Sequence, residues 1–344
     1  MYEFINKYKN KYVNYEDLKD KAIFIRKNDG TYFGEILNQR KHGKGIMVSG
    51  NYFYAGDFQN DTKHGIGYER NQDGTSYDGE FVNDQHQGFG TYWYADGSYY
   101  EGNWCNSQKH GQGLYRKGDD IEYYGDWKFG QIDGKGQLKT KKSKYEGEFK
   151  SGQKNGFGIE KFNDEICYRG YYINGKPEGQ GLLIGDGFKY EGQFKNGLKH
   201  GNGKLIINNV EYEGSFLNDQ KNGYGEIKWP SGSYFKGYFL NDVRQGFGQM
   251  FWQDGSFYKG QWSNDTQQGQ IRLFNIHRLI STTFNTNKAN IEEPTIPQLV
   301  TNQSLNIKQN NTRSRISTKS RISSSCSSPP KKKFCPRNST VQNN

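Results

Sequence analysis

The sequence lacks the features that mark several common protein classes. It has only 7 Pro in 344 residues and no three-residue Gly period, which excludes a collagen-like chain. No run approaches the ~20 apolar residues that a membrane-spanning helix needs. The four Cys, at positions 105, 167, 326 and 335, are too few and too scattered for a disulfide framework. A reducing, intracellular compartment is therefore expected.

The N-terminus also lacks targeting features. No positively charged stretch leads into an apolar run, so no secretory signal is predicted. Residue 2 is Tyr rather than Gly, which removes N-myristoylation. These features predict a cytoplasmic protein.

The aliphatic residues that usually fill a core are scarce, and aromatic residues and glycine replace them. The chain has 26 Tyr, 22 Phe, 6 Trp and 45 Gly. An ordinary globular enzyme of this length would draw its core from Leu, Ile, Val and Ala. This composition predicts a fold whose core is not built mainly from aliphatic side chains.

Positive charge is confined to one end of the chain. Residues 271–344 hold 12 of the 47 Lys and Arg but only two acids, Glu292 and Glu293. The remaining 270 residues hold equal numbers of bases and acids, so the whole net charge of +10 belongs to the tail. A nucleic-acid groove along the body is therefore not expected.

An internal repeat dominates the body of the chain. A unit of the form Tyr-x-Gly-x-aromatic recurs every 22 or 23 residues, with Gly at the third position in all eleven copies and an aromatic residue at the fifth in all but the first, which has Ile36. Nine residues after that Gly comes a Gly-x-Gly pair, from Gly43/Gly45 to Gly246/Gly248, whereas the eleventh unit has Gly269 and Ile271. The units begin at Tyr32, Tyr54, Tyr77, Tyr100, Tyr123, Tyr145, Tyr168, Tyr190, Tyr212, Phe235 and Tyr258.

Period-two alternation in both halves of the unit predicts strands. Tyr, Gly and the aromatic residue should share one face, and both glycines of the pair should also share one face. We expect the glycines where a ring or a second backbone approaches too closely for a Cβ. The constant interval predicts a fixed hairpin loop, and Asp-Gly sites such as Asp73-Gly74 predict the turns between units.

The predicted fold is all-β: an elongated single-layer antiparallel sheet of stacked β-hairpins, each burying its aromatic face through its neighbours. Units such as Tyr100–Trp104 followed by Gly111 and Gly113 resemble MORN repeats, and the resemblance covers residues 32–270. It implies a module of scaffolds or lipid-binding proteins in which catalysis, where present, resides in a separate domain.

The two ends differ from the repeats. Residues 1–31 are predicted to form a cap, with a helix carrying Ile5, Tyr8, Tyr12 and Tyr15 on one stripe and a strand from Ala22 to Arg26 covering the first sheet edge. Residues 271–285, with Leu273, Ile276 and Ile280, are expected to cap the other end. Helices that bind a partner are the open alternative for both ends. Residues 286–344, rich in Asn, Ser and Lys, predict a disordered tail.

The tail holds the candidate site residues. Those for an anionic surface are Arg313, Arg315, Lys319, Arg321, Lys331, Lys332, Lys333 and Arg337. Ser317, Ser323 and Ser328 are candidate phosphorylation sites, and phosphate there would remove much of the positive charge. An anionic membrane, a nuclear-import receptor and an acidic protein remain open as partners, as does a solvated tail with none.

Candidate catalytic and metal sites are weak. Gly170–Lys176 resembles a phosphate loop, but Pro177 replaces the required Ser or Thr. His42, His64 and His110 fall on different hairpins, about 10 Å apart between adjacent units, which is too far for a shared zinc ion. No catalytic residue, cofactor or metal ligand is therefore predicted.

The sequence favours a non-enzymatic scaffold that links protein partners at the cytoskeleton, the cilium or the inner face of a membrane. A phosphoinositide-binding adaptor and a regulatory subunit of a lipid kinase are the alternatives. A secreted repeat that binds choline or glucan is a further alternative, disfavoured by the missing signal. Homodimerisation through an exposed sheet edge is open.

Overall fold

The structure is a computed structural model. It describes residues 12–13, 18, 20–27, 30–162, 166–269, 271–275 and 278–284, with only the backbone described in the last two ranges. The predicted helix carrying Ile5, Tyr8 and Tyr15 and the tail 286–344 lie outside these residues.

The described residues form 25 β-strands. They are β1 (Ile23–Lys27), β2 (Gly30–Leu37), β3 (Arg40–Ser49), β4 (Tyr52–Gln59), β5 (Thr62–Arg70), β6 (Ser76–Val82), β7 (Gln85–Trp93), β8 (Tyr99–Cys105), β9 (Gln108–Lys117), β10 (Ile121–Lys128), β11 (Gln131–Thr140), β12 (Lys144–Lys150), β13 (Gln153–Lys161), β14 (Cys167–Ile173), β15 (Lys176–Gly185), β16 (Phe188–Lys195), β17 (Leu198–Ile207), β18 (Val210–Leu217), β19 (Gln220–Lys228), β20 (Tyr234–Leu240), β21 (Val243–Phe251), β22 (Ser256–Ser263), β23 (Thr266–Gln268), β24 (Ile271–Asn275) and β25 (Arg278–Phe284).

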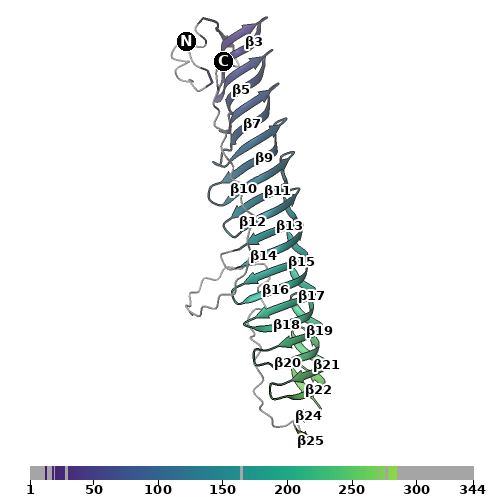
Figure 1. Cartoon of the computed structure of the whole chain (residues 1–344). Helices are drawn as coiled ribbons and strands as arrows, with labels where there is room; N and C mark the ends of the chain where they lie inside the picture. Colours follow the sequence, from purple (N-terminus) through teal and green to yellow (C-terminus); the bar gives the residue numbers. More distant parts are fainter. Residues whose placement is uncertain are drawn as a thin grey trace, which may run out of the picture. The chain divides into compact units, whose positions relative to one another are not determined.

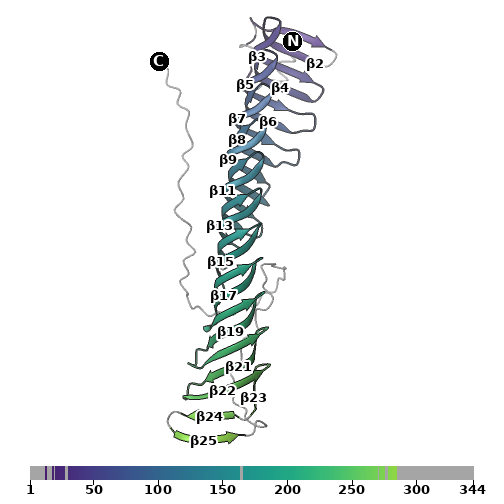
Figure 2. The same cartoon turned by 90° about the vertical axis from the view of Figure 1, so that its right-hand side faces the viewer.

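The strands belong to a single antiparallel sheet, which confirms the predicted all-β fold of hairpins. Contacts divide the chain into two compact units, Met1–Asn163 with Gly170–Gly179, and Asp164–Arg169 with Gln180–Asn344. Within the first unit, β2 to β13 follow one another in chain order (Figure 1). Within the second, β16 to β22 do the same (Figure 2). Each hairpin therefore packs mainly against the hairpins before and after it.

The loop inside each repeat is a tight two-residue turn. In the β6–β7 hairpin Asn83 and Asp84 both have positive φ, 49° and 67°. Two successive residues with positive φ form the turn whose twist matches a right-handed hairpin, and Asn and Asp tolerate that conformation. The fixed hairpin loop predicted from the constant interval is thus confirmed.

The Asp-Gly sites make the longer turns between repeats, as predicted. Gly74 has φ +88°. The Asp73 carboxylate accepts hydrogen bonds from the Thr75 amide at 3.0 Å and hydroxyl at 2.7 Å. Asp96 and Ser98 repeat this arrangement in the next unit, so a short polar residue after Asp-Gly closes the turn.

One prediction about the glycines is wrong, because a bulge follows the two-residue turn. The two glycines of a Gly-x-Gly pair do not share a face. A Cβ on Gly65 would meet Asp57, whereas a Cβ on Gly67 would meet the ring of Tyr54 on the other face. Pairing between β4 and β5 shifts register after Gly56, and Gly65 has φ +65°. Gly65 and Ile66 have no partners on β4, and the positive φ of Gly65 turns the direction of its Cβ to the other face.

The N-terminal residues lie against the sheet face opposite to the tyrosine rings. β1 pairs with β2 along its free edge, from Ile23 opposite Gly34 to Lys27 opposite Gly30. Ahead of β1, Val13 and Leu18 are buried in a cluster whose sheet members are Phe33, Ile46, Phe53 and Ala55. Tyr12 donates a hydrogen bond to Asp78. The chain therefore covers part of its own apolar sheet surface.

At the other end two further strands follow the repeats. β24 pairs with β22, with Phe257 opposite Phe274, and it also pairs with β25. The side chains of Leu273, Ile276 and Ile280 lie outside those that the structure describes.

Candidate interaction surface

One face of the sheet carries a continuous ladder of aromatic rings, hereafter the ring face. In most repeats the Tyr touches the aromatic residue of its own repeat and that of the next repeat, edge to face. In the compact unit Met1–Asn163 with Gly170–Gly179, the centroids of successive rings are 5.0–5.4 Å apart. The rings follow one another in the order Tyr32, Phe58, Tyr54, Phe81, Tyr77, Trp104, Tyr100, Trp127, Tyr123, Phe149, Tyr145 and Tyr172. In the second unit, Tyr190 contacts Phe194 and Phe216, each at 5.1 Å. This is the favoured geometry for aromatic pairs, and it links each hairpin to the next.

Glycine lets each tyrosine lie flat on the sheet. A Cβ on Gly102 would lie 2.5 Å from the Cα of Gly113, and one on Gly113 would lie 2.3–2.5 Å from the Tyr100 ring. The Tyr100 hydroxyl donates to the carbonyl of Asn103 at 2.9 Å, and the same bond recurs from Tyr32 to Tyr258. The ring face is thus buried, and its tyrosine hydroxyls are hydrogen-bonded.

A row of cations lies over these rings. The residue two before the Gly pair is Lys or Arg in seven units: Lys41, Lys63, Lys109, Lys154, Lys199, Lys221 and Arg244. Lys63 lies 5.2 Å from the Phe81 centroid, and Arg244 lies 4.2 Å from that of Trp262. These distances permit cation–π attraction. This cation position was not predicted from the sequence, although it stands at a fixed distance from the Gly pair.

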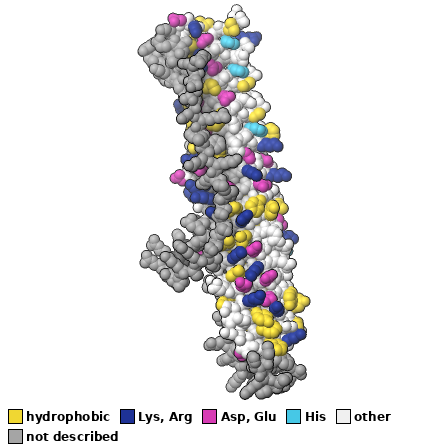
Figure 3. Space-filling view, viewed as in Figure 1, with side chains coloured by type: hydrophobic (Ala, Val, Ile, Leu, Met, Phe, Trp, Pro, Cys, Tyr) yellow, Lys and Arg dark blue, Asp and Glu magenta, His cyan; other side chains and the backbone are white. Residues whose placement is uncertain are grey.

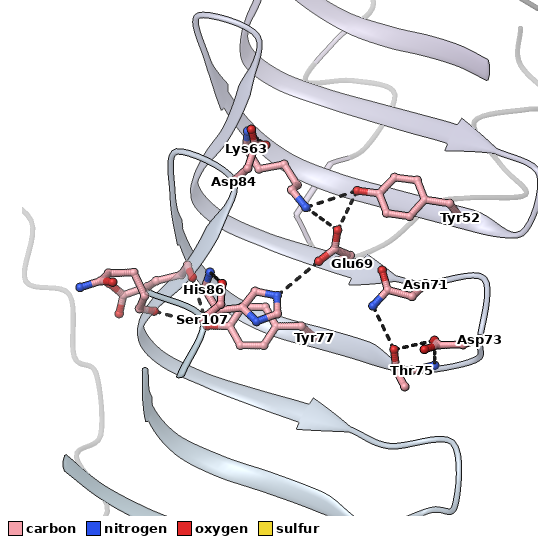
Figure 4. A network of polar contacts seen from close by, with 12 residues as sticks. Tyr52, Lys63, Glu69, Asn71, Asp73, Thr75, Tyr77, Asp84, His86 and Ser107 are labelled. Atoms are coloured by element: carbon pink, nitrogen blue, oxygen red, sulfur yellow. Dashed lines mark hydrogen bonds and ion pairs between the residues drawn. The ribbon is translucent and has the colours of Figure 1, made fainter. Parts of the chain in front are cut away.

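Some of these cations hold buried carboxylates. Figure 4 shows Glu69 accepting hydrogen bonds from Lys63 and from the Tyr52 hydroxyl at 2.8 Å, with the His86 imidazole at 3.3 Å. The His86 ring stacks on Tyr77 with centroids 3.7 Å apart. Burial alone would raise the pKa of Glu69, but the hydrogen bond to His86 and the charge of Lys63 lower it to about 2.

The same arrangement recurs four repeats later. Glu160 pairs with Lys154 and accepts hydrogen bonds from Tyr172 at 3.0 Å and Ser143 at 2.6 Å. Glu160 follows Lys154 by six residues, as Glu69 follows Lys63. Because their oxygens are already bound, these carboxylates stabilise the hairpins and are poorly suited to accept a substrate proton.

In the second compact unit, the sheet face opposite to the ring face, hereafter the open face, exposes both aromatic and charged side chains. Tyr224, Tyr238 and Phe247, from β19, β20 and β21, expose 57%, 52% and 44% of their surface. The Tyr224 and Tyr238 rings meet at 5.5 Å, and Lys259 Nζ lies 5.8 Å from the Phe247 centroid. We call Tyr224, Tyr238 and Phe247 the aromatic patch.

A shallow groove adjoins the aromatic patch. Tyr224 is one of its lining residues, and the charged ones are Glu191, Lys204, Glu211, Glu213, Glu226 and Lys228. Lys204 pairs with Glu211 at 2.7 Å, and Lys228 pairs with Glu226 at 3.2 Å. Glu213 forms no ion pair with any described residue. Glu191 pairs with Lys189 at 3.0 Å and Glu226 also with Lys236 at 3.1 Å, so lysines balance the lining carboxylates other than Glu213. Figure 3 shows basic, acidic and hydrophobic side chains interspersed over this unit.

The candidate residues of the tail, from Arg313 to Arg337 with the three serines, lie outside the described part of the chain. His42, His64 and His110 lie on β3, β5 and β9, and the Nδ1 atom of each is buried without a hydrogen-bond partner. Among the described residues, no three His, Cys, Asp or Glu side chains converge as a metal site would require.

The phosphate-loop pattern is a hairpin turn. Asn174 and Gly175 have φ 49° and 79° and connect β14 to β15, as the two-residue turns of other repeats do. Within the described ranges no helix has the length and apolarity to cross a bilayer.

The aromatic patch and the groove were not predicted as a site. Sequence alternation alone could have placed the middle residue of each Gly-x-Gly on the open face, where Phe89, Tyr224 and Phe247 are exposed. The bulge obscured which residues beside it share that face.

Comparison with known proteins agrees with this geometry. No curated protein matches the chain. The family model for the MORN repeat matches eleven segments, 32–52, 54–76, 77–99, 100–120, 123–141, 145–165, 168–187, 190–209, 212–234, 235–257 and 258–270. These segments cover more than half of the chain and begin at the eleven ring positions, so the protein belongs to the MORN-repeat family.

Proposed function

We propose that this protein is a non-enzymatic scaffold that binds a protein partner through the aromatic patch and the adjoining groove. The observation that carries the proposal is the difference between the two faces of the sheet. The ring face is filled by its own rings and hydrogen bonds, whereas the open face exposes Tyr224 and Tyr238 beside charged groups. Exposed aromatic residues with a polar surround are typical of protein interfaces.

The charge of the groove favours a basic partner segment. Glu191, Glu211, Glu213 and Glu226 line the groove with Lys204 and Lys228. Glu213, which forms no ion pair with a described residue, would attract Lys or Arg and repel the phosphates of a phosphoinositide headgroup. We therefore favour a protein partner over lipid binding by the repeats.

The basic tail would supply a second contact. Arg313 to Arg337 would bind an anionic surface, and phosphate on Ser317, Ser323 or Ser328 would weaken that contact. A cytoplasmic location at the cytoskeleton, the cilium or a membrane is the setting we propose for such a two-contact scaffold.

Two assays test the proposal. Affinity purification from native cells would compare the intact chain with the triple variant Tyr224→Ala, Tyr238→Ala, Phe247→Ala and with a truncation of residues 286–344. A partner should be lost with the triple variant and retained with Phe129→Ala, a control whose ring is 64% exposed in a turn. Recovery of a catalytic lipid-kinase chain would instead support the regulatory-subunit alternative.

Flotation with phosphoinositide vesicles supplies the second arm. We expect binding only when residues 286–344 are present. If the truncated chain still floats with the vesicles, and substitutions in the groove abolish that flotation, the proposal is contradicted and the lipid-binding adaptor is favoured.

A further inference from the structure

Three lysines lie side by side on the sheet face opposite to the ring face, in the first compact unit. Lys139 on β11 is directly opposite Lys144 on β12, and Lys144 is directly opposite Lys161 on β13. Each lysine is adjacent in sequence to Tyr145 or to a residue opposite Tyr145, so its side chain points away from the ring face. All three lysines are exposed. We call Lys139, Lys144 and Lys161 the lysine cluster.

Carboxylates do not neutralise the lysine cluster. None of its three members forms an ion pair with a residue that the structure describes. Glu122, opposite Lys139 on β10, is bound by Arg116, whose Nε lies 3.0 Å from the carboxylate. Glu146, two residues after Lys144, lies on the same face as the cluster. One carboxylate therefore stands beside three ammonium groups.

The pairing of like charges across neighbouring strands destabilises a sheet. Opposite charges face each other elsewhere in this sheet: Arg116 is opposite Glu122, and Lys228 is opposite Glu211. In the lysine cluster, positive charge instead faces positive charge across three consecutive strands. An anionic ligand on this surface would relieve that repulsion.

We propose that the lysine cluster binds an acidic peptide segment, an extended run of Asp and Glu from a protein partner. Neighbouring strands lie about 4.8 Å apart, so the three lysines form a straight line about 10 Å long. In an extended peptide, side chains on one side are about 7 Å apart, which flexible lysine side chains can match. This surface belongs to the first compact unit and is separate from the aromatic patch and its groove.

Acidic residues on both sides of the lysine cluster favour a narrow ligand over a membrane. Glu146 lies towards the middle of the strands. Asp119 and Asp120 lie in the turn before β10, where Asp120 pairs with Lys141 at 2.6 Å. A broad anionic surface would meet these carboxylates as well, whereas an extended peptide can contact the lysine cluster alone.

The test uses the full chain, a hexaglutamate peptide and a carbodiimide, which joins a carboxylate to an adjacent lysine amine. Mass spectrometry measures the yield of peptide adducts at each lysine, so adducts on the basic tail are counted separately. We expect the yield at the lysine cluster to exceed that at Lys128 and Lys150, two exposed lysines outside it, about tenfold at low salt. Equal yields at all exposed lysines, or adducts confined to the tail, would overturn the proposal.

Competition identifies the class of anion. Underivatised hexaglutamate added in excess without carbodiimide activation should protect the lysine cluster from a general amine-labelling reagent. Oligouridylate or phosphatidylserine vesicles at equal charge should protect it less. Stronger protection by either of them would assign the surface to single-stranded RNA or to a membrane and overturn the peptide proposal.

Lys144→Glu reverses the central charge of the lysine cluster. It should lower the adduct yield at Lys139 and Lys161 about tenfold and leave the yield at Lys128 unchanged. Because the change also removes the repulsion between strands, the unfolding temperature should stay the same or rise. Lys150→Glu, at the exposed end of β12, is the matched control and should leave adducts at the lysine cluster unchanged. Unchanged yields at Lys139 and Lys161 in Lys144→Glu would contradict the proposal, and a lower unfolding temperature would contradict the repulsion between the lysines.

Discussion

At the scale of single residues, three glycines of a repeat have two different roles. Gly102 and Gly113 permit the Tyr100 ring to lie on the backbone, whereas Gly111 adopts φ +60° at the bulge. The ring hydroxyl then binds the carbonyl of Asn103 beside that bulge. A repeat therefore needs Tyr rather than Phe for its hydrogen bond, and Phe235 is the one unit without it.

The steric role predicts a large effect of Gly102→Ala. The added methyl would overlap the backbone at Gly113, which cannot move as a flexible side chain can. We expect a loss of about 3 kcal/mol in the free energy of unfolding. The control is Gly118→Ala, at φ +50° with open space around its Cβ, which should cost about 1 kcal/mol. Urea unfolding measures both, and equal losses would refute close approach as the reason for Gly102.

The buried Glu69 predicts a pH-dependent contribution to stability. Its pKa is about 2 in the folded chain, below the 4.5 of an unfolded chain, so the folded state favours the charged form. The stabilisation is therefore present above pH 4.5 and disappears as the pH falls towards 2.

Glu69→Gln should cost about 2–4 kcal/mol at pH 7, because Lys63 loses its buried partner. Thermal unfolding from pH 7 down to pH 2.5 should show the difference from the native chain shrinking below pH 4.5. Glu122→Gln, which removes an exposed partner of Arg116, is the matched control and should change stability by at most about 0.5 kcal/mol. A Glu69→Gln deficit that persists undiminished at pH 2.5 would contradict the ionised pair.

At the scale of hairpins, turns join one repeat to the previous one. Asp84 follows Asn83 in the β6–β7 turn, and its carboxylate accepts a hydrogen bond from the Lys63 amide at 2.8 Å. The Asp84 amide donates in return to the Lys63 carbonyl at 3.0 Å. This reciprocal pair recurs at Asp61, Asp219, Asp242 and Asp265, and it sets the register between successive hairpins.

Removing this carboxylate should loosen one junction. Asp84→Ala leaves the Lys63 amide without its acceptor and should cost about 1–2 kcal/mol. Hydrogen–deuterium exchange should speed up at β5 and β6 while β9 and β10 keep their protection. Asp119→Ala, in a turn where Asp119 has no such bond, should have little effect. Uniformly faster exchange throughout the chain would argue against a local link.

The elements were predictable because the repeat supplies eleven independent copies of each signal. Alternation around Tyr54 or Tyr190 predicts strands, and the constant interval predicts the turn. The bulge could not be predicted, because it depends on how β4 and β5 pair, with Gly56 opposite Gly67 but Asp57 opposite His64, and not on a pattern within one strand. This irregularity, with the positive φ of Gly65, explains why the glycine pair was wrongly placed on one face.

At the scale of the whole molecule, the repeat predicts how the chain folds but not what it binds. The ring face is the same in most units, so the sequence pattern identifies it directly. The exposed residues of the open face, such as Phe89 and Tyr224, differ between repeats. Which of them lie side by side is known only once the pairing of neighbouring strands is known. The sequence therefore predicted a protein-binding scaffold but indicated individual site residues only in the charged tail, and the residues of the aromatic patch were not identified.

Photo-crosslinking in native cells tests the proposed interaction surface most directly. A benzophenone amino acid would replace Tyr224, Tyr238 or Phe247 in turn, and Phe129 in a control chain. We expect the three positions of the aromatic patch to crosslink to one common protein and the Phe129 position to leave it unlabelled. Crosslinks that arise only from the Phe129 position, or from the aromatic patch to lipid alone, would contradict a protein-binding scaffold.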